Sequence, residues 1–278
     1  MTHRPLVSAA IAFALLTCPG AAQERPFPYV VGRQDALIAP AGVGLAVLGD
    51  RVANREAPLT RAQIAALTPD DVNGFDRTAA GNWSPDWGNR SDLARDALVA
   101  GAALVTLGPL VPRAVHGQWR DAAILGTMLG ESYLLLRGAT YTAKGLAGRT
   151  RPFVHNTALT VDERLALSEA DPQDAYQSFY SGHSAAAFAL ATFMSRVFTD
   201  MRGRSTASDV LWASSLSVAG LTAYARVKAG MHYPSDVLVG AAVGTAIGLG
   251  VPWLHRADGG AAVDVSVGPG GVVVRLPR

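Results

Sequence analysis

An arginine, a histidine and an aspartate interrupt an otherwise apolar part of the chain in the stretch ARVKAGMHYPSD. Pro234 makes one continuous helix through this stretch unfavourable, because the residue before a proline is pushed out of the α region. We therefore predict a helix that ends near Arg226, a turn that carries His232, and a new helix capped by Ser235 or Asp236. Polar groups at a junction between two apolar helices are more typical of a functional site than of a core.

Two earlier stretches have the same character. KGLAGRTRP places Lys144 and Arg151 seven residues apart. SFYSGHSAAAF places Ser181, Gly182 and His183 at the start of another apolar segment. If these stretches lie at one end of a helical bundle, cations, two histidines, one carboxylate and a glycine at a helix start come together there.

This combination of groups suits a phosphate. A helix N-terminus offers backbone N–H donors and a favourable dipole to an anion. Arg151 and Arg226 can make forked contacts with phosphate oxygens, while Lys144 acts as a point charge. Gly182 lets the backbone approach closely. Two histidines allow one nucleophile and one acid, and a carboxylate beside a histidine fixes its tautomer.

Each stretch alone also has a structural interpretation. Lys144, Arg149 and Arg151 could form a solvated basic joint, His183 could be a polar residue at a helix start, and Asp236 could simply be an N-cap. Their joint occurrence favours a site. No His-x3-His, HExxH or cysteine pair is present in the sequence, so we expect no metal and no other cofactor.

The ordered pattern K-x6-RP, SGH and R-x5-H-x3-D resembles the type 2 phosphatidic acid phosphatase (PAP2) superfamily, which also includes bacterial acid phosphatases and vanadium-dependent haloperoxidases. The resemblance covers about residues 93–254, and GMHYPSDVLVG is more similar to the lipid-phosphatase branch than to the soluble acid phosphatases. Tyr180 stands where the family usually has proline, and Ala225 where it usually has serine. Neither position is a principal catalytic group in the family.

The resemblance implies a mechanism. His232 attacks phosphorus and forms a phosphohistidine, with Asp236 orienting the ring, and His183 protonates the leaving oxygen and then activates water. The implied reaction is metal-independent hydrolysis of phosphate monoesters or diphosphates, with lipid phosphates as the expected substrates. The implied phosphate-binding groups are Lys144, Arg151, Ser181, the Gly182 amide and Arg226.

Three alternatives to a lipid phosphatase stay open. The chain could be a soluble periplasmic acid phosphatase of broad specificity. It could be a haloperoxidase in which His232 ligates vanadate, although such enzymes generally have larger helical scaffolds. It could also be a catalytically inactive scaffold that only binds anions.

The surrounding elements are predicted to be mainly helical. With 49% hydrophobic and 17% charged residues, the chain is too apolar for disorder, and its net charge of +2 argues against a nucleic-acid partner. We predict an all-α bundle with about five or six core helices and the site at one end. Five apolar segments run approximately over residues 93–112, 121–142, 183–198, 208–226 and 236–254.

These segments are of borderline length for a membrane span, which needs about 17 apolar residues or more. Arginines in the joints 113–120 and 196–207 would make those joints cytoplasmic. The site would then face the periplasm, provided that the short apolar segment 37–50, which contains Pro40, does not span. We therefore expect an inner-membrane protein with a periplasmic site, or else a soluble periplasmic protein.

The chain ends have their own signals. Arg4, an apolar run and GAA before Gln23 are typical of a secretory signal, and LLTC at Cys18 offers a lipoprotein alternative. Val alternates with small or polar residues around Gly-Pro-Gly-Gly near the C-terminus, which indicates a β-hairpin. The predicted organisation is a signal peptide (1–22), an N-terminal exported region (23–92), a PAP2-like helical domain (93–256) and a hairpin tail (257–278).

Overall fold

The structure is a computed structural model. It describes the residues 26–53, 58–111, 119–170 and 174–258, together with the backbone of residues 264–268 and 271–275. The predicted signal peptide (1–22) lies outside the described residues.

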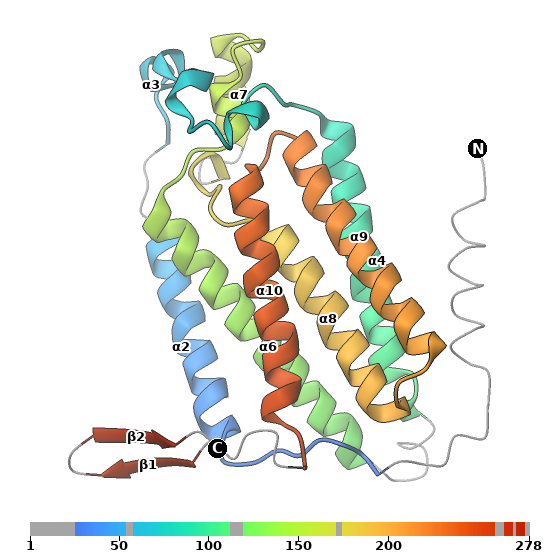
Figure 1. Ribbon diagram of the computed structural model, residues 1–278. Helices are drawn as coiled ribbons and strands as arrows, with labels where there is room; N and C mark the ends of the chain where they lie inside the picture. The colour runs from blue at the N-terminus through green and yellow to red at the C-terminus, as the bar shows by residue number, and fades with distance from the viewer. Residues whose placement is uncertain are drawn as a thin grey trace.

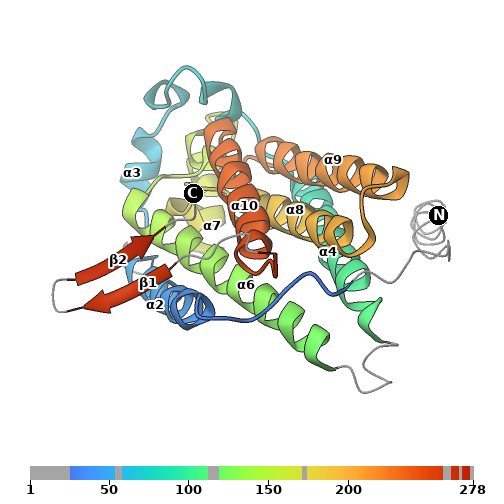
Figure 2. The ribbon, with the colours of Figure 1, turned by 60° about the horizontal axis from the view of Figure 1, so that its bottom comes forward.

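Long helices lying side by side form a bundle (Figure 1), so the predicted mainly helical fold is confirmed. Helix α8 lies inside it, packed against α4, α9 and α10, and α2 packs along α6 (Figure 2). The buried positions of α8 are mostly alanine and other small residues, which lets its neighbours approach closely. Within the part of the chain that the structure describes, six helices build the bundle: α2 (Asp35–Ala53), α4 (Pro85–Leu107), α6 (Trp119–Ala147), α8 (Gly182–Arg202), α9 (Thr206–Lys228) and α10 (Pro234–Leu254).

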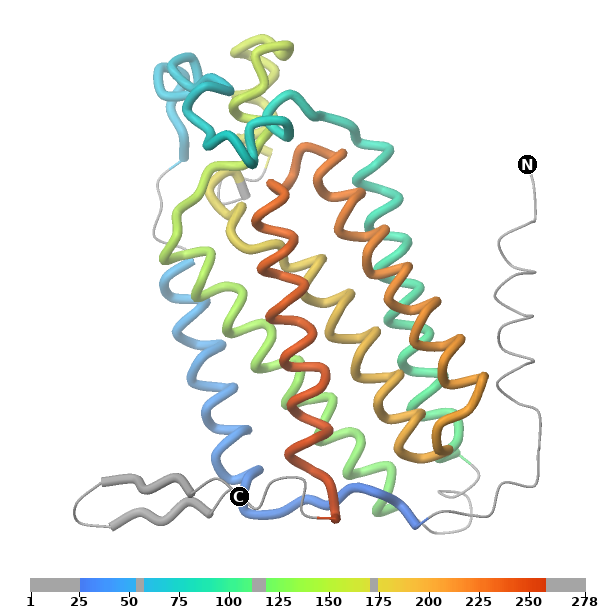
Figure 3. The backbone as a smooth tube through the Cα atoms, viewed as in Figure 1, coloured from blue at the N-terminus to red at the C-terminus, as the bar shows by residue number. Residues whose placement is uncertain are grey.

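Short elements cover one end of this bundle, the end at which α6 and α9 finish and α8 and α10 begin (Figure 3). We call it the site end. Two small apolar clusters, one including Ile64 and Phe153 and the other including Ala79 and Tyr233, pack parts of these short elements together. The elements are the helices α3 (Arg61–Ala66) and α7 (Val161–Ala170) and the 3₁₀ turns Pro69–Asp71, Arg77–Ala79, Pro152–His155 and Asp174–Tyr176.

Helix α2 differs from the expectation of a short apolar segment over residues 37–50. It is 19 residues long, includes Pro40, and belongs to the bundle. Glycines explain its close packing on α6: a Cβ atom at Gly138 would lie 2.6 Å from the backbone nitrogen of Ala46, and Gly145 approaches the backbone of Val52 in the same way. Hydrophobicity alone could not indicate this backbone-to-backbone contact.

The domain boundary expected between residues 92 and 93 falls inside α4, which begins at Pro85. Ser84 caps this helix through a hydrogen bond from the Trp87 amide, and proline occupies the first helical position. The helical signal therefore starts before the apolar run on which the prediction was based. Residues on both sides of the boundary belong to one helix of the bundle.

Residues 29–30 and 255–256 meet at the end of the bundle opposite the site end. Tyr29 forms an isolated antiparallel bridge with Arg256, and the Val30 amide donates to the His255 carbonyl oxygen at 2.8 Å. Further along, the strands β1 (Asp264–Gly268) and β2 (Gly271–Arg275) pair antiparallel, with their two terminal glycines opposite each other.

Four described segments of the bundle helices α2, α4, α9 and α10 contain no charged residue. By length and composition, α2 and α10 could each cross a membrane. The exposed side chains of α10 include Leu238, Leu249 and Trp253. We call this surface the uncharged belt; it comprises the outward-facing residues of the segments 36–48, 97–107, 210–224 and 237–254.

Candidate active site

The three sequence motifs meet at the site end, where they line one cavity of about 500 Å³. Lys144 comes from the last turn of α6 and Arg226 from the last turn of α9. Gly182 and His183 open α8, and His232 lies in the turn before α10. Six of the eight predicted site residues line the cavity: Lys144, Arg151, Gly182, His183, Arg226 and His232.

The cavity suits an anion. Arg95 and Arg137 add two cations to its wall, and none of its lining residues is a carboxylate. The first turn of α8 adds the positive end of a helix dipole. A Cβ atom at Gly182 would lie only 3.3 Å from Cγ2 of Thr140, so the glycine permits close packing at this edge of the cavity.

Ser181 and Asp236 are fully buried and do not line the cavity. The hydroxyl of Ser181 caps α8 by accepting a hydrogen bond from the Ser184 amide at 3.3 Å. The Ser181 amide donates to the carbonyl oxygen of Asp236 at 3.1 Å, which ties the start of α8 to the start of α10. In this structure Ser181 therefore shapes the helix end.

His232 is held as a neutral ring with one defined tautomer. Its Nδ1 atom lies 2.8 Å from the carbonyl oxygen of Ser178, and because a carbonyl only accepts, Nδ1 carries the proton. Burial lowers the pKa of His232 well below its usual value, and the cations of Arg151, Arg226 and Lys144 lower it further. The Nε2 atom therefore carries a lone pair at neutral pH.

Asp236 lies beside His232 but forms no hydrogen bond with it, since Asp236 Oδ2 is 3.9 Å from His232 Nδ1. Asp236 is the third residue of α10, and its carboxylate turns back to accept from the Tyr233 amide at 2.9 Å. It also accepts from the Ser178 hydroxyl at 2.6 Å and from Arg149 Nη1 at 2.6 Å. Asp236 thus reaches His232 through Ser178.

Arg149 joins two buried carboxylates and is therefore not part of a solvated joint. Its two terminal nitrogens contact Asp236 at 2.6 Å and Asp76 at 2.7 Å, and its guanidinium lies over the ring of Tyr233 at 4.1 Å. Asp76 in turn accepts from the Ser235 amide at 2.9 Å and from the Ser235 hydroxyl at 2.6 Å. The N-terminal part of the chain therefore helps to fix the start of α10.

Sequence reasoning missed two residues of α4 that contact His183. Asp92 Oδ1 lies 2.7 Å and Arg95 Nη1 lies 2.6 Å from His183 Nε2. Burial first, and then the cations of Arg226 and Arg95, lower the pKa of His183 to about 4, while Asp92 opposes this shift. The i,i+3 spacing of Asp92 and Arg95 on one helix face is a weak signal, and nothing local links it to a histidine about 90 residues away.

The PAP2 superfamily is the family whose sequence model matches this chain, over residues 122–259. The matched range contains all eight predicted site residues and runs from α6 to the end of α10. No curated protein and no solved structure matches the chain. The chain therefore belongs to the PAP2 superfamily, as the resemblance predicted, and this membership supports a phosphatase, a phosphoric monoester hydrolase in general terms.

Proposed function

We propose that this protein is a metal-independent phosphatase that hydrolyses phosphate monoesters or diphosphates of lipids through a phosphohistidine on His232. One observation carries the proposal. The buried His232, whose Nε2 is unprotonated, lines a cavity together with several cations and a helix N-terminus.

In the first step, Nε2 of His232 attacks phosphorus while the bond from phosphorus to the leaving oxygen breaks. Lys144, Arg151, Arg226 and the start of α8 hold the phosphate oxygens and stabilise the charge that develops on them. The hydrogen bond from Nδ1 to the main chain remains in place as the ring becomes positively charged. The main-chain carbonyl thus keeps the nucleophile in the reactive tautomer.

His183 supplies the proton for the leaving oxygen. In the empty site its pKa is about 4, so its ring is neutral at neutral pH. A bound phosphate dianion adds negative charge beside the ring and therefore favours the protonated form. In the second step the neutral His183 takes a proton from water, the water oxygen bonds to phosphorus, and the phosphorus–nitrogen bond to His232 breaks.

The shape of the cavity supports a lipid substrate. Besides its cations, the lining includes the side chains of Leu136, Ala186 and Tyr133. Tyr133 precedes Lys144 by eleven residues on α6, so the wall extends about 16 Å along the helix. The phosphate end of a lipid would lie against the cations and its apolar part against this wall.

The uncharged belt supports a position in a lipid bilayer, with the site end at one surface. The arginines at the other end of the bundle favour a cytoplasmic location for that end. If all six helices span, α2 puts residues 26–34 on the cytoplasmic side. Cleavage of an exported signal at residue 22 would put these residues on the opposite side. A cleaved signal, six spanning helices and a periplasmic site therefore cannot all be true at once.

The test is phosphate release by the purified full-length protein in EDTA, on a lipid phosphate and on a small aryl phosphate. We expect release from both, with the lipid preferred, and loss of turnover in His232→Gln. The phosphoenzyme should be trapped after alkaline denaturation, because a phosphorus–nitrogen bond hydrolyses in acid. A thermal melt of each variant separates lost chemistry from lost folding.

His183→Gln provides a second test. It should retain more activity on an aryl phosphate, whose leaving group needs little protonation, than on a lipid phosphate. Turnover that is unchanged in His232→Gln would contradict the phosphohistidine route. Preference for the aryl phosphate would favour the acid-phosphatase alternative, and halide oxidation with added vanadate but no hydrolysis would favour the haloperoxidase.

A further inference from the structure

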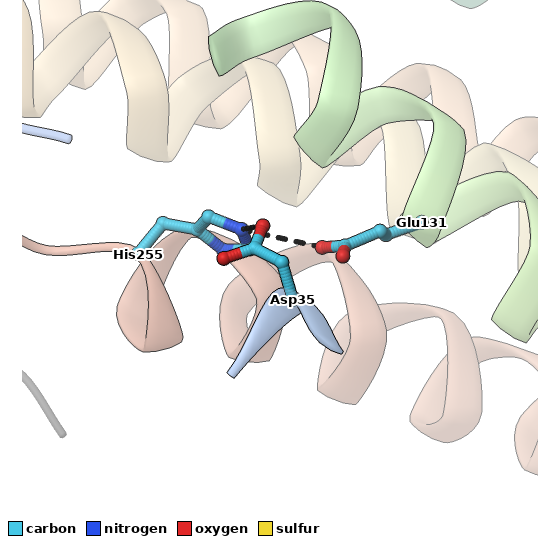
Figure 4. A group of neighbouring side chains, drawn as sticks. All are labelled: Asp35, Glu131 and His255. Carbon is cyan, nitrogen blue, oxygen red and sulfur yellow. Dashed lines mark hydrogen bonds and ion pairs between the residues drawn. The ribbon is translucent and has the colours of Figure 1, made fainter. Parts of the chain in front are cut away.

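Three ionisable side chains meet at the end of the bundle opposite the site end (Figure 4). Asp35 is the first residue of α2, Glu131 lies within α6, and His255 caps the C-terminus of α10. The Nε2 atom of His255 is 2.8 Å from Asp35 Oδ1 and 3.2 Å from Glu131 Oε2. His255 is 0% and Glu131 is 2% exposed, so both are buried, while Asp35 is partly exposed.

The hydrogen bonds of His255 leave Glu131 without a hydrogen-bond partner among the described residues. Its Nδ1 atom lies 2.8 Å from the carbonyl oxygen of Val251, so Nδ1 carries a proton. In the neutral ring, the Nε2 lone pair would face two carboxylates. A second proton on Nε2 can be donated to Asp35, but neither oxygen of Glu131 has a hydrogen-bond partner among the described residues. A buried carboxylate without such a partner is unfavourable.

We propose that Asp35, Glu131 and His255 bind a divalent transition-metal ion of the zinc class. A cation between the three side chains accepts electron pairs from all of them and neutralises the two carboxylates. The three donor atoms lie within 4.8 Å of one another. Zinc binds nitrogen and oxygen ligands at about 2.0–2.2 Å, which puts tetrahedral ligand atoms about 3.4 Å apart.

The surroundings have the features of a metal site. The hydrogen bond from His255 Nδ1 to the Val251 carbonyl fixes the ring with Nε2 facing the carboxylates, in the way that a metal-binding histidine donates its other ring N–H to a neighbouring acceptor. The ligands come from three separate elements, which explains why no spacing motif in the sequence indicates the site. Water can take the fourth position.

The ion at this site acts on the structure and not on catalysis. Helix α10 separates His255 from the cavity by 21 residues, or about 30 Å. By joining α2, α6 and α10, the ion stabilises the contact between the N-terminal helix and the rest of the bundle. Chelation should therefore lower the melting temperature and leave phosphate release at low temperature unchanged.

The test uses the purified full-length protein, stripped with a chelator and titrated with zinc alone. Metal content after dialysis should be one ion per chain, and zinc should raise the melting temperature. Cobalt in place of zinc should give visible d–d absorption. Glu131→Gln and His255→Gln should each weaken zinc binding at least tenfold and abolish the thermal response, whereas Asp209→Asn, an exposed acid at the same end, should change neither.

Absence of stoichiometric zinc binding by the wild type would overturn the proposal, as would wild-type binding in Glu131→Gln. Another outcome is that the wild type shows no response to zinc while His255→Gln has a lower melting temperature. That combination would mean that a proton, and not a metal, links His255 to the two carboxylates. That result would also overturn the proposal.

Discussion

The main chain of Ser178 orients His232, since the carbonyl oxygen of Ser178 lies 2.8 Å from His232 Nδ1. A carbonyl cannot change its protonation state, so the tautomer that presents Nε2 is maintained over a wide pH range. The hydroxyl of the same serine donates to Asp236 at 2.6 Å, which joins the buried carboxylate to the peptide that holds the ring. We therefore expect Asp236 to act on His232 mainly through Ser178.

Asp236→Asn should first of all reduce stability. The substitution removes the charged partner of Arg149 Nη1 while the contact of Arg149 with Asp76 remains, so the free energy of unfolding should fall by about 1.5–3 kcal/mol. Ser178→Ala removes one hydrogen bond but keeps the carbonyl, so kcat should fall by less than about 10-fold. Chemical denaturation and kcat on an aryl phosphate measure the two effects, with the exposed Asp86→Asn as control. A stable Asp236→Asn with kcat reduced by orders of magnitude would instead indicate direct action on His232.

The pH profile should respond in opposite directions to two neighbouring residues of α4. Arg95 lowers and Asp92 raises the pKa of His183, which is about 4 in the empty site. Activity needs the protonated His183 for the leaving group, so kcat/KM should fall as pH rises. Arg95→Gln raises the pKa of His183 and should move this alkaline limb to higher pH, while Asp92→Asn should move it to lower pH.

The same direction of shift in both variants would mean that His183 is not the acid. Leu93→Asn serves as the control, since Leu93 lies between the two residues in sequence and its side chain is exposed. Its profile should match that of the wild type.

Two cations close together in sequence should have separable roles. Arg149→Gln breaks contacts with Asp76 and Asp236 and should lower the melting temperature. Lys144→Gln should weaken inhibition by inorganic phosphate about 10- to 100-fold, because a hydrogen bond to a charged group is worth about 1.5–3 kcal/mol. Melting curves and phosphate inhibition constants check both. If Arg149→Gln kept full stability and lost phosphate affinity, Arg149 would belong to the phosphate site.

The apolar wall of the cavity should affect lipid substrates alone. Leu136→Gln should raise KM for a lipid phosphate about tenfold, because each apolar CH₂ group buried is worth about 0.8 kcal/mol. KM for a small aryl phosphate should not change. Ala123→Gln, which lies on the same helix outside the cavity lining, is the control. Equal changes for both substrates in Leu136→Gln would mean that the wall does not contact the lipid chain.

Much of the site could be predicted from sequence because its residues lie where helices begin or end. Proline, glycine and capping residues indicate those points, so the first turn of α8 and the turn before α10 follow from the local sequence. The order and spacing of the three motifs also indicated the family. Because these helix ends lie at one end of the bundle, six of the predicted residues share one cavity: Lys144, Arg151, Gly182, His183, Arg226 and His232.

Contacts between distant segments could not be predicted in this way. The contact of Asp92 with His183 and the brace from Asp76 to Arg149 each join residues more than 70 positions apart. The packing of α2 on α6 depends on glycines whose role appears only when two backbones meet. A single sequence has no local pattern that records such pairings.

The orientation of the bundle is the last prediction. In a Cys18→Ser background, Ala166→Cys places a thiol on exposed α7 at the site end, and Arg204→Cys places one in the exposed joint at the opposite end. A membrane-impermeant maleimide should label the first in right-side-out vesicles and the second only after the vesicles are opened. The reverse pattern would mean that α2 starts outside, as cleavage of a signal at residue 22 requires, and that the site faces the cytoplasm. Labelling of both thiols in the soluble fraction would mean that the uncharged belt does not lie in a bilayer, because a spanning bundle cannot expose both ends to one side.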